Sequence, residues 1–119
     1  MSKNDRTLEG LLILDGDIME VGGGYWLSLK ARQVAITTAI PHGIKYSLCL
    51  LTPNDDRVVC FDNAHPINVG KGRAKKITPV NDHVHREGKM RPYEYTDAGT
   101  LLVDFWKAVY DYLKKVGVQ

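Results

Sequence analysis

Two histidines in the second half of the chain have the spacing that most readily suggests chemistry. His83 and His85 are two residues apart in the segment VNDHVHREG, residues 80–88. In an extended backbone such residues point to the same side, so both imidazoles can reach one substrate or one ion. Histidine also gains and loses a proton most readily near neutral pH. The pair could therefore be metal ligands, an acid and a base, or part of an ordinary polar loop.

A metal site needs more ligands than this segment supplies. A catalytic zinc ion normally takes three protein ligands and a structural one takes four. His42, His65, Asp82 or Cys60 would have to complete the site from a distance, and nothing in their spacing requires this. We therefore expect neither a metal nor a cofactor.

Acid–base cleavage of RNA fits the same residues better. RNA is cut without metal when a base activates its 2′-OH, an acid protonates the leaving oxygen and cations stabilise the charge on the phosphorus. Small basic domains often hold such residues unused, so a binding role without catalysis remains an alternative. The candidate catalytic residues are His83, His85, Asp62 and Lys45. The candidate RNA- and phosphate-binding residues are Arg86, Arg91, Lys71, Arg73, Lys75, Lys76, His42 and Asn63.

Positive charge is concentrated around the histidine pair. Residues 65–91 contain seven Lys and Arg against two Asp and Glu, a net charge of +5 in a chain whose total is +2. A local basic region on a nearly neutral protein indicates an anionic partner, most commonly nucleic acid. A solvated basic loop is the alternative.

The first half of the chain is typical of β-strands. Residues 8–21 are apolar and rich in β-formers, interrupted by Asp15-Gly16, which could be a turn or, as we favour, a bulge. The glycines at 22–24 can turn the chain into a strand from Tyr25. Residues 44–51 and 57–64 predict a second hairpin, in which Thr52 pairs with Arg57. This register places Tyr46, Leu48 and Leu50 on one face with Val59, Phe61 and Asn63.

The other face of this sheet is expected to be open. Alternation in the strand from Tyr25 separates Tyr25, Leu27, Leu29 and Ala31 from Trp26, Ser28, Lys30 and Arg32. An aromatic ring among cations suits single-stranded nucleic acid, although an ordinary solvated face has the same composition. The open face would carry Trp26, Lys30, Arg32, Lys45, Ser47 and Asp62.

The last third of the chain predicts a basic loop, two short extended segments and a helix. We expect the loop at 68–78, the extended segments near 83–86 and 92–95, and a helix that begins at Thr96 or Asp97 and ends at Gly117. The predicted fold is a single α+β domain, residues 1–119, with a twisted antiparallel sheet of four to six strands and the C-terminal helix packed on one face. The apolar stripe of that helix is Leu101, Leu102, Phe105, Val109, Leu113 and Val116.

Cysteine content and hydropathy suggest an intracellular protein. Cys49 and Cys60 form no CxxC pair, so we expect two buried, reduced thiols. No apolar run reaches the length of a membrane span, and the polar N-terminus does not look like a signal peptide. We expect a cytoplasmic chain with no membrane partner.

Several segments resemble the TumE-like family of toxins from bacterial toxin–antitoxin systems. They are PHGIKYSLCL, FDNAH, DHVHREGKMRPYEYTD and TLLVDFWKAV, and the similarity covers nearly the whole chain, weakest before Gly22. One departure is the stretch 64–81, where many members have a short glycine-rich link. The residues that match the family pattern are His42, Lys45, Tyr46, Asp62, Asn63, Asp82, His83, His85, Arg86, Arg91, Pro92 and Tyr93.

The resemblance implies a growth-inhibiting toxin of a type II system. Its partners would be a cognate helix-turn-helix antitoxin and RNA, since such toxins usually cleave mRNA without a metal, some of them only at the ribosome; a homodimer is compatible with this role. The alternatives are a non-catalytic nucleic-acid-binding or regulatory module and a domain that only binds its antitoxin.

Overall fold

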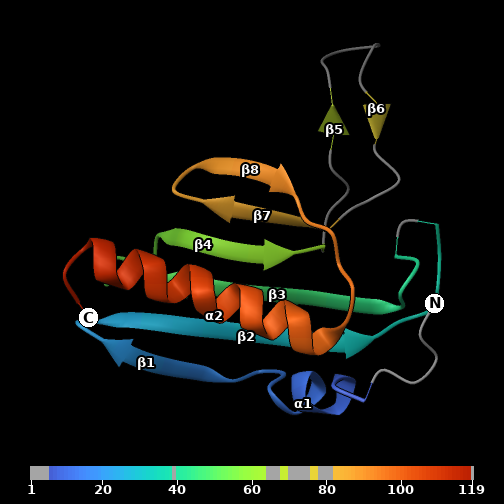
Figure 1. Ribbon diagram of the computed structural model, residues 1–119, viewed down its shortest axis with the longest axis horizontal. Helices are drawn as coiled ribbons and strands as arrows, with labels where there is room; N and C mark the ends of the chain where they lie inside the picture. Colours follow the sequence, from blue (N-terminus) through green and yellow to red (C-terminus); the bar gives the residue numbers. More distant parts are fainter. Residues whose placement is uncertain (1–5, 39, 64–67, 70–75, 78–81, 119) are drawn as a thin grey trace.

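A computed structural model describes residues 6–38, 40–63, 68–69, 76–77 and 82–118, and within them a long helix crosses one face of an antiparallel sheet (Figure 1). The sheet has six strands in the order β1-β2-β3-β4-β7-β8, and β5 pairs with β6 separately. The predicted α+β fold is therefore confirmed. The elements are α1 (Leu8–Ile13), β1 (Ile18–Gly22), β2 (Tyr25–Gln33), β3 (Ile44–Leu51), β4 (Arg57–Asp62), β5 (Asn68–Val69), β6 (Lys76–Ile77), β7 (His83–Arg86), β8 (Lys89–Pro92) and α2 (Ala98–Lys115).

Two tight turns build the outer hairpins of the sheet. Gly23 and Gly24, with φ of 60° and 81°, connect β1 to β2 as predicted. Glu87 and Gly88, with φ of 51° and 84°, connect β7 to β8. Positive φ at both central residues matches the twist of paired strands. Because this second turn is so short, β8 begins at Lys89 and ends at Pro92, so the extended segment predicted near 92–95 lies three residues too late and shares only Pro92 with the strand.

The predicted register of the central hairpin is confirmed. Ser47 lies opposite Asp62, and Leu48 lies opposite Phe61. The register shifts near the turn, where Leu51 and not Thr52 pairs with Arg57, so that predicted pair was wrong. On the far side of β4, His83 lies opposite Asp62. The long-range pairing of β4 with β7 thus puts Ser47, Asp62 and His83 in one row across three strands.

The core lies between the sheet and α2. Asp97 caps the helix, since its Oδ1 accepts a hydrogen bond from the backbone N–H of Thr100 at 2.7 Å, and Gly117 ends it with a φ of 84°. The predicted stripe is buried except for Leu102, which is half-buried, and Val116, which lies beyond the helix and is 41% exposed. The buried core includes Leu27, Leu29, Tyr46, Leu48, Leu50, Val59, Phe61, Leu101, Phe105, Val109 and Leu113.

The N-terminal segment differs from its prediction. Residues 8–13 form α1 and not a strand, and Asp15-Gly16 belongs to a turn and not to a bulge. A short apolar run fits a helix or a strand equally well, and packing decides between them. Here Leu11 is fully buried in the core, and Thr7 Oγ1 accepts a hydrogen bond from the backbone N–H of Gly99 at 2.7 Å. These contacts attach α1 to the start of α2.

The two cysteines are joined by a disulfide, so the prediction of reduced thiols was wrong. Cys49 of β3 and Cys60 of β4 lie directly opposite each other, with their Cα atoms 4.1 Å apart. Both are buried as predicted, with 3% and 2% of their surface exposed. Paired residues on neighbouring strands project from the same face, so the two sulfur atoms meet.

None of the helices in the described residues is both long enough and apolar enough to cross a membrane.

Candidate functional site

The sheet face away from α2 carries the polar residues that alternation predicted for it. Trp26, Lys30 and Arg32 of β2 are exposed there, and Lys45 of β3 is half-buried. Toward β4 and β7 the same face carries more deeply buried polar groups, among them Asp62. From β2 toward β7, the side chains of the open face therefore change from exposed cations to a buried carboxylate beside histidines.

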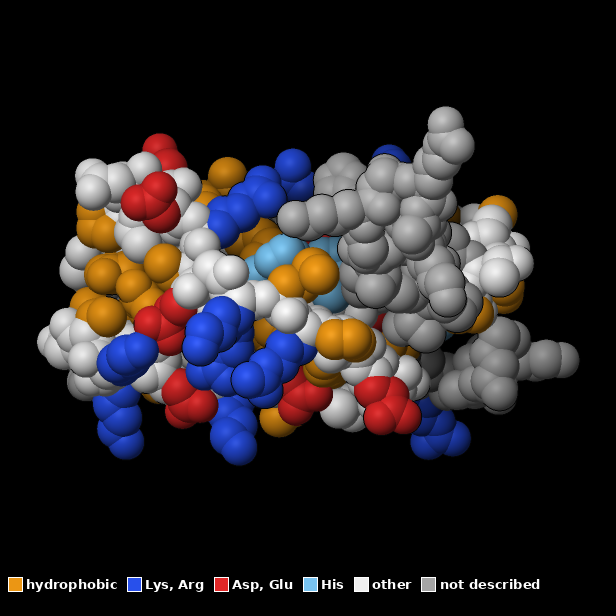
Figure 2. Space-filling model, turned by 90° about the horizontal axis from the view of Figure 1, so that it is seen from above, with side chains coloured by type: hydrophobic (Ala, Val, Ile, Leu, Met, Phe, Trp, Pro, Cys, Tyr) orange, Lys and Arg blue, Asp and Glu red, His pale blue; other side chains and the backbone are white. Residues whose placement is uncertain are grey.

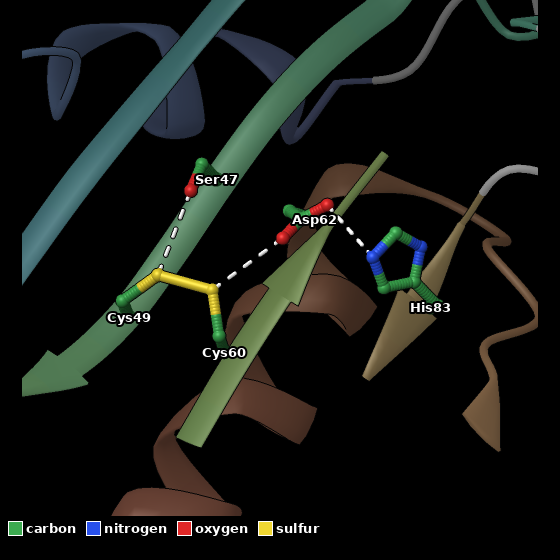
Figure 3. Close-up of a disulfide and its surroundings, with 5 residues drawn as sticks. All are labelled: Ser47, Cys49, Cys60, Asp62 and His83. Carbon is green, nitrogen blue, oxygen red and sulfur yellow. Dashed lines mark hydrogen bonds and ion pairs between the residues drawn. A yellow bond between two sulfur atoms is a disulfide. The ribbon is translucent and has the colours of Figure 1, made fainter. Parts of the chain in front are cut away.

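Asp62 and His83 form a buried pair on this face. His83 Nε2 lies 2.9 Å from Asp62 Oδ1, and the two side chains are 6% and 9% exposed. Figure 3 shows the Asp62 carboxylate between the imidazole and the disulfide, where its Oδ2 lies 3.5 Å from Cys60 Sγ. A buried carboxylate needs a hydrogen-bond donor, because burial without one is costly, and the His83 ring can supply it, whereas a disulfide sulfur has no hydrogen to donate. We refer to Asp62, His83 and His85 below as the open-face cluster.

His85 completes the open-face cluster from two residues further along β7. Its ring centroid lies 4.7 Å from that of His83, with the ring planes at 83°. Burial lowers the pKa of His85, and the neighbouring His83 lowers it further. The neutral imidazole, with a lone pair to offer, is thus the favoured form of His85 at neutral pH. As predicted, the two histidines point to the same side.

The open-face cluster also has the composition of a metal site. One ligand atom from each of the three side chains lies within 4.8 Å of the other two. The sequence offered His42, His65, Asp82 and Cys60 as third ligands and did not indicate Asp62 in this role. Only the pairing of β4 with β7 places Asp62 there, and those strands are distant in the chain.

A second histidine–aspartate pair lies on the helix side of the sheet. His42 Nε2 is 2.9 Å from Asp82 Oδ2, and the same oxygen accepts a hydrogen bond from the Tyr46 hydroxyl at 2.7 Å. His42 also stacks on Tyr95, with ring centroids 4.0 Å apart. Burial and the Asp82 charge raise the pKa of Tyr46, so its hydroxyl keeps its proton. We refer to these four residues below as the helix-side cluster.

Both ring nitrogens of His42 are occupied. Nδ1 accepts a hydrogen bond from the backbone N–H of Ile44 at 3.3 Å, which leaves Nε2 to donate to Asp82. Asn63 is also occupied: its Oδ1 accepts from the Tyr46 N–H and its Nδ2 donates to the Ile44 carbonyl. The two predicted phosphate-binding residues His42 and Asn63 thus lie apart from the open-face cluster. Their hydrogen bonds hold the start of β3 in place.

The predicted cations divide between the two sides of the sheet. Arg86 alternates with His85, and its guanidinium lies 3.9 Å from Asp111 of α2. Arg91 is opposite Val84, which packs against the core, so it also belongs to the helix side. In Figure 2, which looks onto the β8 edge, histidine side chains reach the surface close to Lys and Arg side chains. Lys71, Arg73 and Lys75 lie outside the described residues, and of Lys76 only the backbone, in β6, is described.

The chain matches the model of one protein family over a stretch that contains both polar clusters. The model of that family, described as Toxin TumE, matches residues 16–113, which include both clusters. The chain therefore belongs to a family of toxins, and that family is Toxin TumE. No curated protein and no solved structure matches the chain. The match confirms the resemblance and the toxin role that it implied.

Proposed function

We propose that this chain is the toxin of a type II toxin–antitoxin pair and acts as a metal-independent endoribonuclease on mRNA. The family supports the toxin role. The observation that carries the enzymatic proposal is the open-face cluster: a histidine held by a buried carboxylate, with a second imidazole beside it. Two adjacent imidazoles, one fixed by an acidic residue, are the groups that proton transfer to and from RNA requires.

His85 is the proposed base and His83 the proposed acid. His85 removes the proton of a ribose 2′-OH, whose oxygen attacks the adjacent phosphorus. His83 gives a proton to the departing 5′-oxygen while Asp62 holds its ring in place through Nε2. The products are a 2′,3′-cyclic phosphate and a 5′-hydroxyl. One proton is taken up by the protein and one is given back, so no metal and no further reactant is needed.

Cations of β2 and β3 are the proposed phosphate contacts. Lys45 lies on the open face two residues before Ser47, the strand partner of Asp62. Lys30 is paired with Ser47, and Arg32 is paired with Lys45. These side chains can stabilise the charge that develops on phosphorus, and Trp26 on the same face can stack a base. Because Arg86 and Arg91 alternate to the helix side, we assign them a role only in more distant RNA contacts.

A toxin of this family implies an antitoxin, and we propose that it carries a helix-turn-helix domain. The toxin would act in the cytoplasm, where mRNA is found. Co-expression of the neighbouring gene product should restore growth and yield a stable complex with this chain. If no neighbouring product suppresses toxicity, the assignment to a two-component system is wrong.

Nucleic-acid binding without catalysis is the second candidate. The exposed Trp26, Lys30 and Arg32 on one face support it, since they can bind a single strand whether or not the histidines react. This alternative predicts RNA binding whose affinity falls with salt and that survives removal of both histidines. It also predicts intact RNA after long incubation.

Incubation of the purified chain with RNA in EDTA tests the enzymatic proposal. Cleavage that leaves 2′,3′-cyclic phosphate and 5′-hydroxyl ends is expected, and it should be lost in His85→Ala. His42→Gln is the matched control, since it removes a histidine from the other pair and keeps a donor and an acceptor. Intact RNA under these conditions, with normal growth after strong induction in cells, would refute the proposal.

A further inference from the structure

The open-face cluster joins two imidazoles and one carboxylate from two neighbouring strands. Asp62 of β4 and His83 of β7 are directly paired, and His85 projects from the same face of β7. One ligand atom from each lies within 4.8 Å of the other two. Two nitrogens and one carboxylate oxygen are the donor set that first-row divalent ions such as Zn²⁺ favour in proteins.

The spacing is close to that of an occupied site. Ligand atoms about 2.0–2.2 Å from one zinc ion lie within roughly 3.6 Å of one another. Asp62 and His83 already meet this condition, since Oδ1 and Nε2 are 2.9 Å apart. The third ligand atom, on His85, must move closer to these two atoms. His85 is the least buried of the three residues. Rotation of this side chain can bring its nitrogen toward the pair without a change in the strands.

The surroundings of the cluster favour a cation. Asp62 and His83 are more than nine-tenths buried, so the carboxylate has lost most of its water. Its second oxygen lies 3.5 Å from the Cys60 sulfur, which as part of a disulfide has no hydrogen to donate. His85 is half-buried, which leaves a path for an ion and a position for water or another ligand. A site with three protein ligands and an open position is the usual form of a reactive or exchangeable zinc site.

The helix-side cluster offers no comparable site. His42 uses Nδ1 to accept from Ile44 and Nε2 to donate to Asp82, and Asp82 also accepts from Tyr46. An ion there would have to break three hydrogen bonds of the core. Only the open-face cluster combines two histidines with a carboxylate among the described residues.

We infer that Asp62, His83 and His85 bind one Zn²⁺ ion reversibly, and that the ion inhibits RNA cleavage. Binding follows from the three side chains alone, whereas the inhibitory effect rests on the proposed function. The ion occupies the lone pairs of both imidazoles, which can then neither accept nor deliver a proton. The zinc-bound chain is a latent form of the toxin, and chelation restores the active one.

Calorimetric titration of the tag-free, EDTA-treated full chain with ZnCl2 tests the site. We expect one ion per chain with a Kd of about 10 μM or tighter. Asp62→Asn and His85→Gln should each weaken binding by at least roughly tenfold, as expected for the loss of a ligand. The matched control His42→Gln should bind within about twofold of the wild type, because no ligand is lost. A weaker wild-type Kd, or a smaller loss in both ligand variants, overturns the inference.

Visible absorption of bound Co²⁺ gives a second reading of the same site. The spectrum of the wild type and of His42→Gln should match and should saturate at one ion per chain. The spectrum should change in His85→Gln, whose half-buried position makes it the variant most certain to fold; circular dichroism checks this. An identical spectrum in His85→Gln shows that the ion is held elsewhere, which overturns the assignment.

RNA cleavage separates this inference from the proposed function. Cleavage in EDTA that one equivalent of Zn²⁺ abolishes supports both. Zinc binding with no cleavage under any condition leaves the site and refutes the endoribonuclease. Cleavage in EDTA by a chain that does not bind Zn²⁺ refutes the site alone. Undiminished cleavage by a chain saturated with Zn²⁺ refutes the inhibitory role.

Discussion

The two histidine–aspartate pairs of this protein have the same chemistry and opposite surroundings. In each, an imidazole Nε2 lies 2.9 Å from a carboxylate oxygen. On the helix side, His42 and Asp82 are tied further to Tyr46, Tyr95 and the backbone. On the open face, the Asp62–His83 pair has His85 beside it. The comparison teaches that the chemical role proposed for the open-face pair depends on its neighbours and not on the pair itself.

The two pairs are interleaved in the chain. Asp82 and His83 are consecutive, yet Asp82 bonds to Tyr46 on the helix side and His83 bonds to Asp62 on the open face. Since successive residues of an extended chain point to opposite sides, the start of β7 supplies one member to each pair. The helix-side pair thereby anchors the strand that presents the pair to which we assign the proposed chemistry.

The largest expected effect is on catalysis at the open face. We expect His85→Ala to lower the rate of RNA cleavage by about 10²-fold or more, which is the usual contribution of a positioned acid or base. Its thermal midpoint should stay close to that of the wild type, because His85 is only half-buried. Single-turnover cleavage of a labelled RNA measures the rate. An unchanged rate would mean that the acid–base assignment of this cluster is wrong.

The next effect is on stability at the helix side. Asp82→Ala leaves the Tyr46 hydroxyl and the His42 N–H without their acceptor, so we expect a loss of about 2–4 kcal/mol in the free energy of unfolding. Urea denaturation measures it. Asp111→Ala is the control, since its side chain is 55% exposed and should cost almost nothing. A loss no larger than that of the control would remove the distinction between the two pairs.

A smaller effect is expected from the loss of one hydrogen bond of the helix-side cluster, the bond from Tyr46 to Asp82. Tyr46→Phe removes the hydroxyl that donates to Asp82 at 2.7 Å and keeps the buried ring. Hydrogen bonds to charged groups contribute about 1.5–3 kcal/mol, so we expect a loss of that size. RNA cleavage by the folded variant should equal that of the wild type. Lower cleavage at full folding would show that the helix-side cluster acts on the open face.

The smallest effect is expected for His42→Gln. Glutamine can donate to Asp82 and accept from the Ile44 N–H, so the free energy of unfolding should fall by no more than about 1 kcal/mol, the cost of the lost stacking. Cleavage should not change. A large loss of cleavage, with the fold intact, would return His42 to the group of RNA-contacting residues that its sequence first suggested.

Local patterns predicted most of the sheet and the helix. Alternation gave the faces of β2, β3 and β4, and the turn TPNDD gave the register between β3 and β4. That same register pairs Cys49 with Cys60, so the disulfide could have been predicted from it. The helical conformation of α1 could not have been predicted, because six mostly apolar residues fit a helix or a strand equally well. Only the contact of Leu11 with the core decides between the two.

The candidate site was predictable only in part. Strand alternation correctly placed His83 and His85 on one side, since this depends on two residues of one strand. The approach of Asp62 to His83, and of His42 to Asp82, depends on strands that meet after a long separation in the chain; His42 and Asp82 are 40 residues apart. No local pattern contains such information. Arg86 could have been separated from the histidines, since alternation within β7 places it on the side opposite His85, whereas the side of Arg91 depends on the pairing of β7 with β8.

The interleaving of Asp82 and His83 has a consequence for how this sequence can change. Insertion of a single residue between the Asp82–His83 dipeptide and β8 would reverse the alternation. The side chains of Asp82 and His83 would then each point to the wrong side of the sheet. Insertion of two residues would restore the sides but displace the histidines from Asp62. The segment from Asp82 to Arg86 should therefore accept substitutions at Val84 far more readily than any change in length.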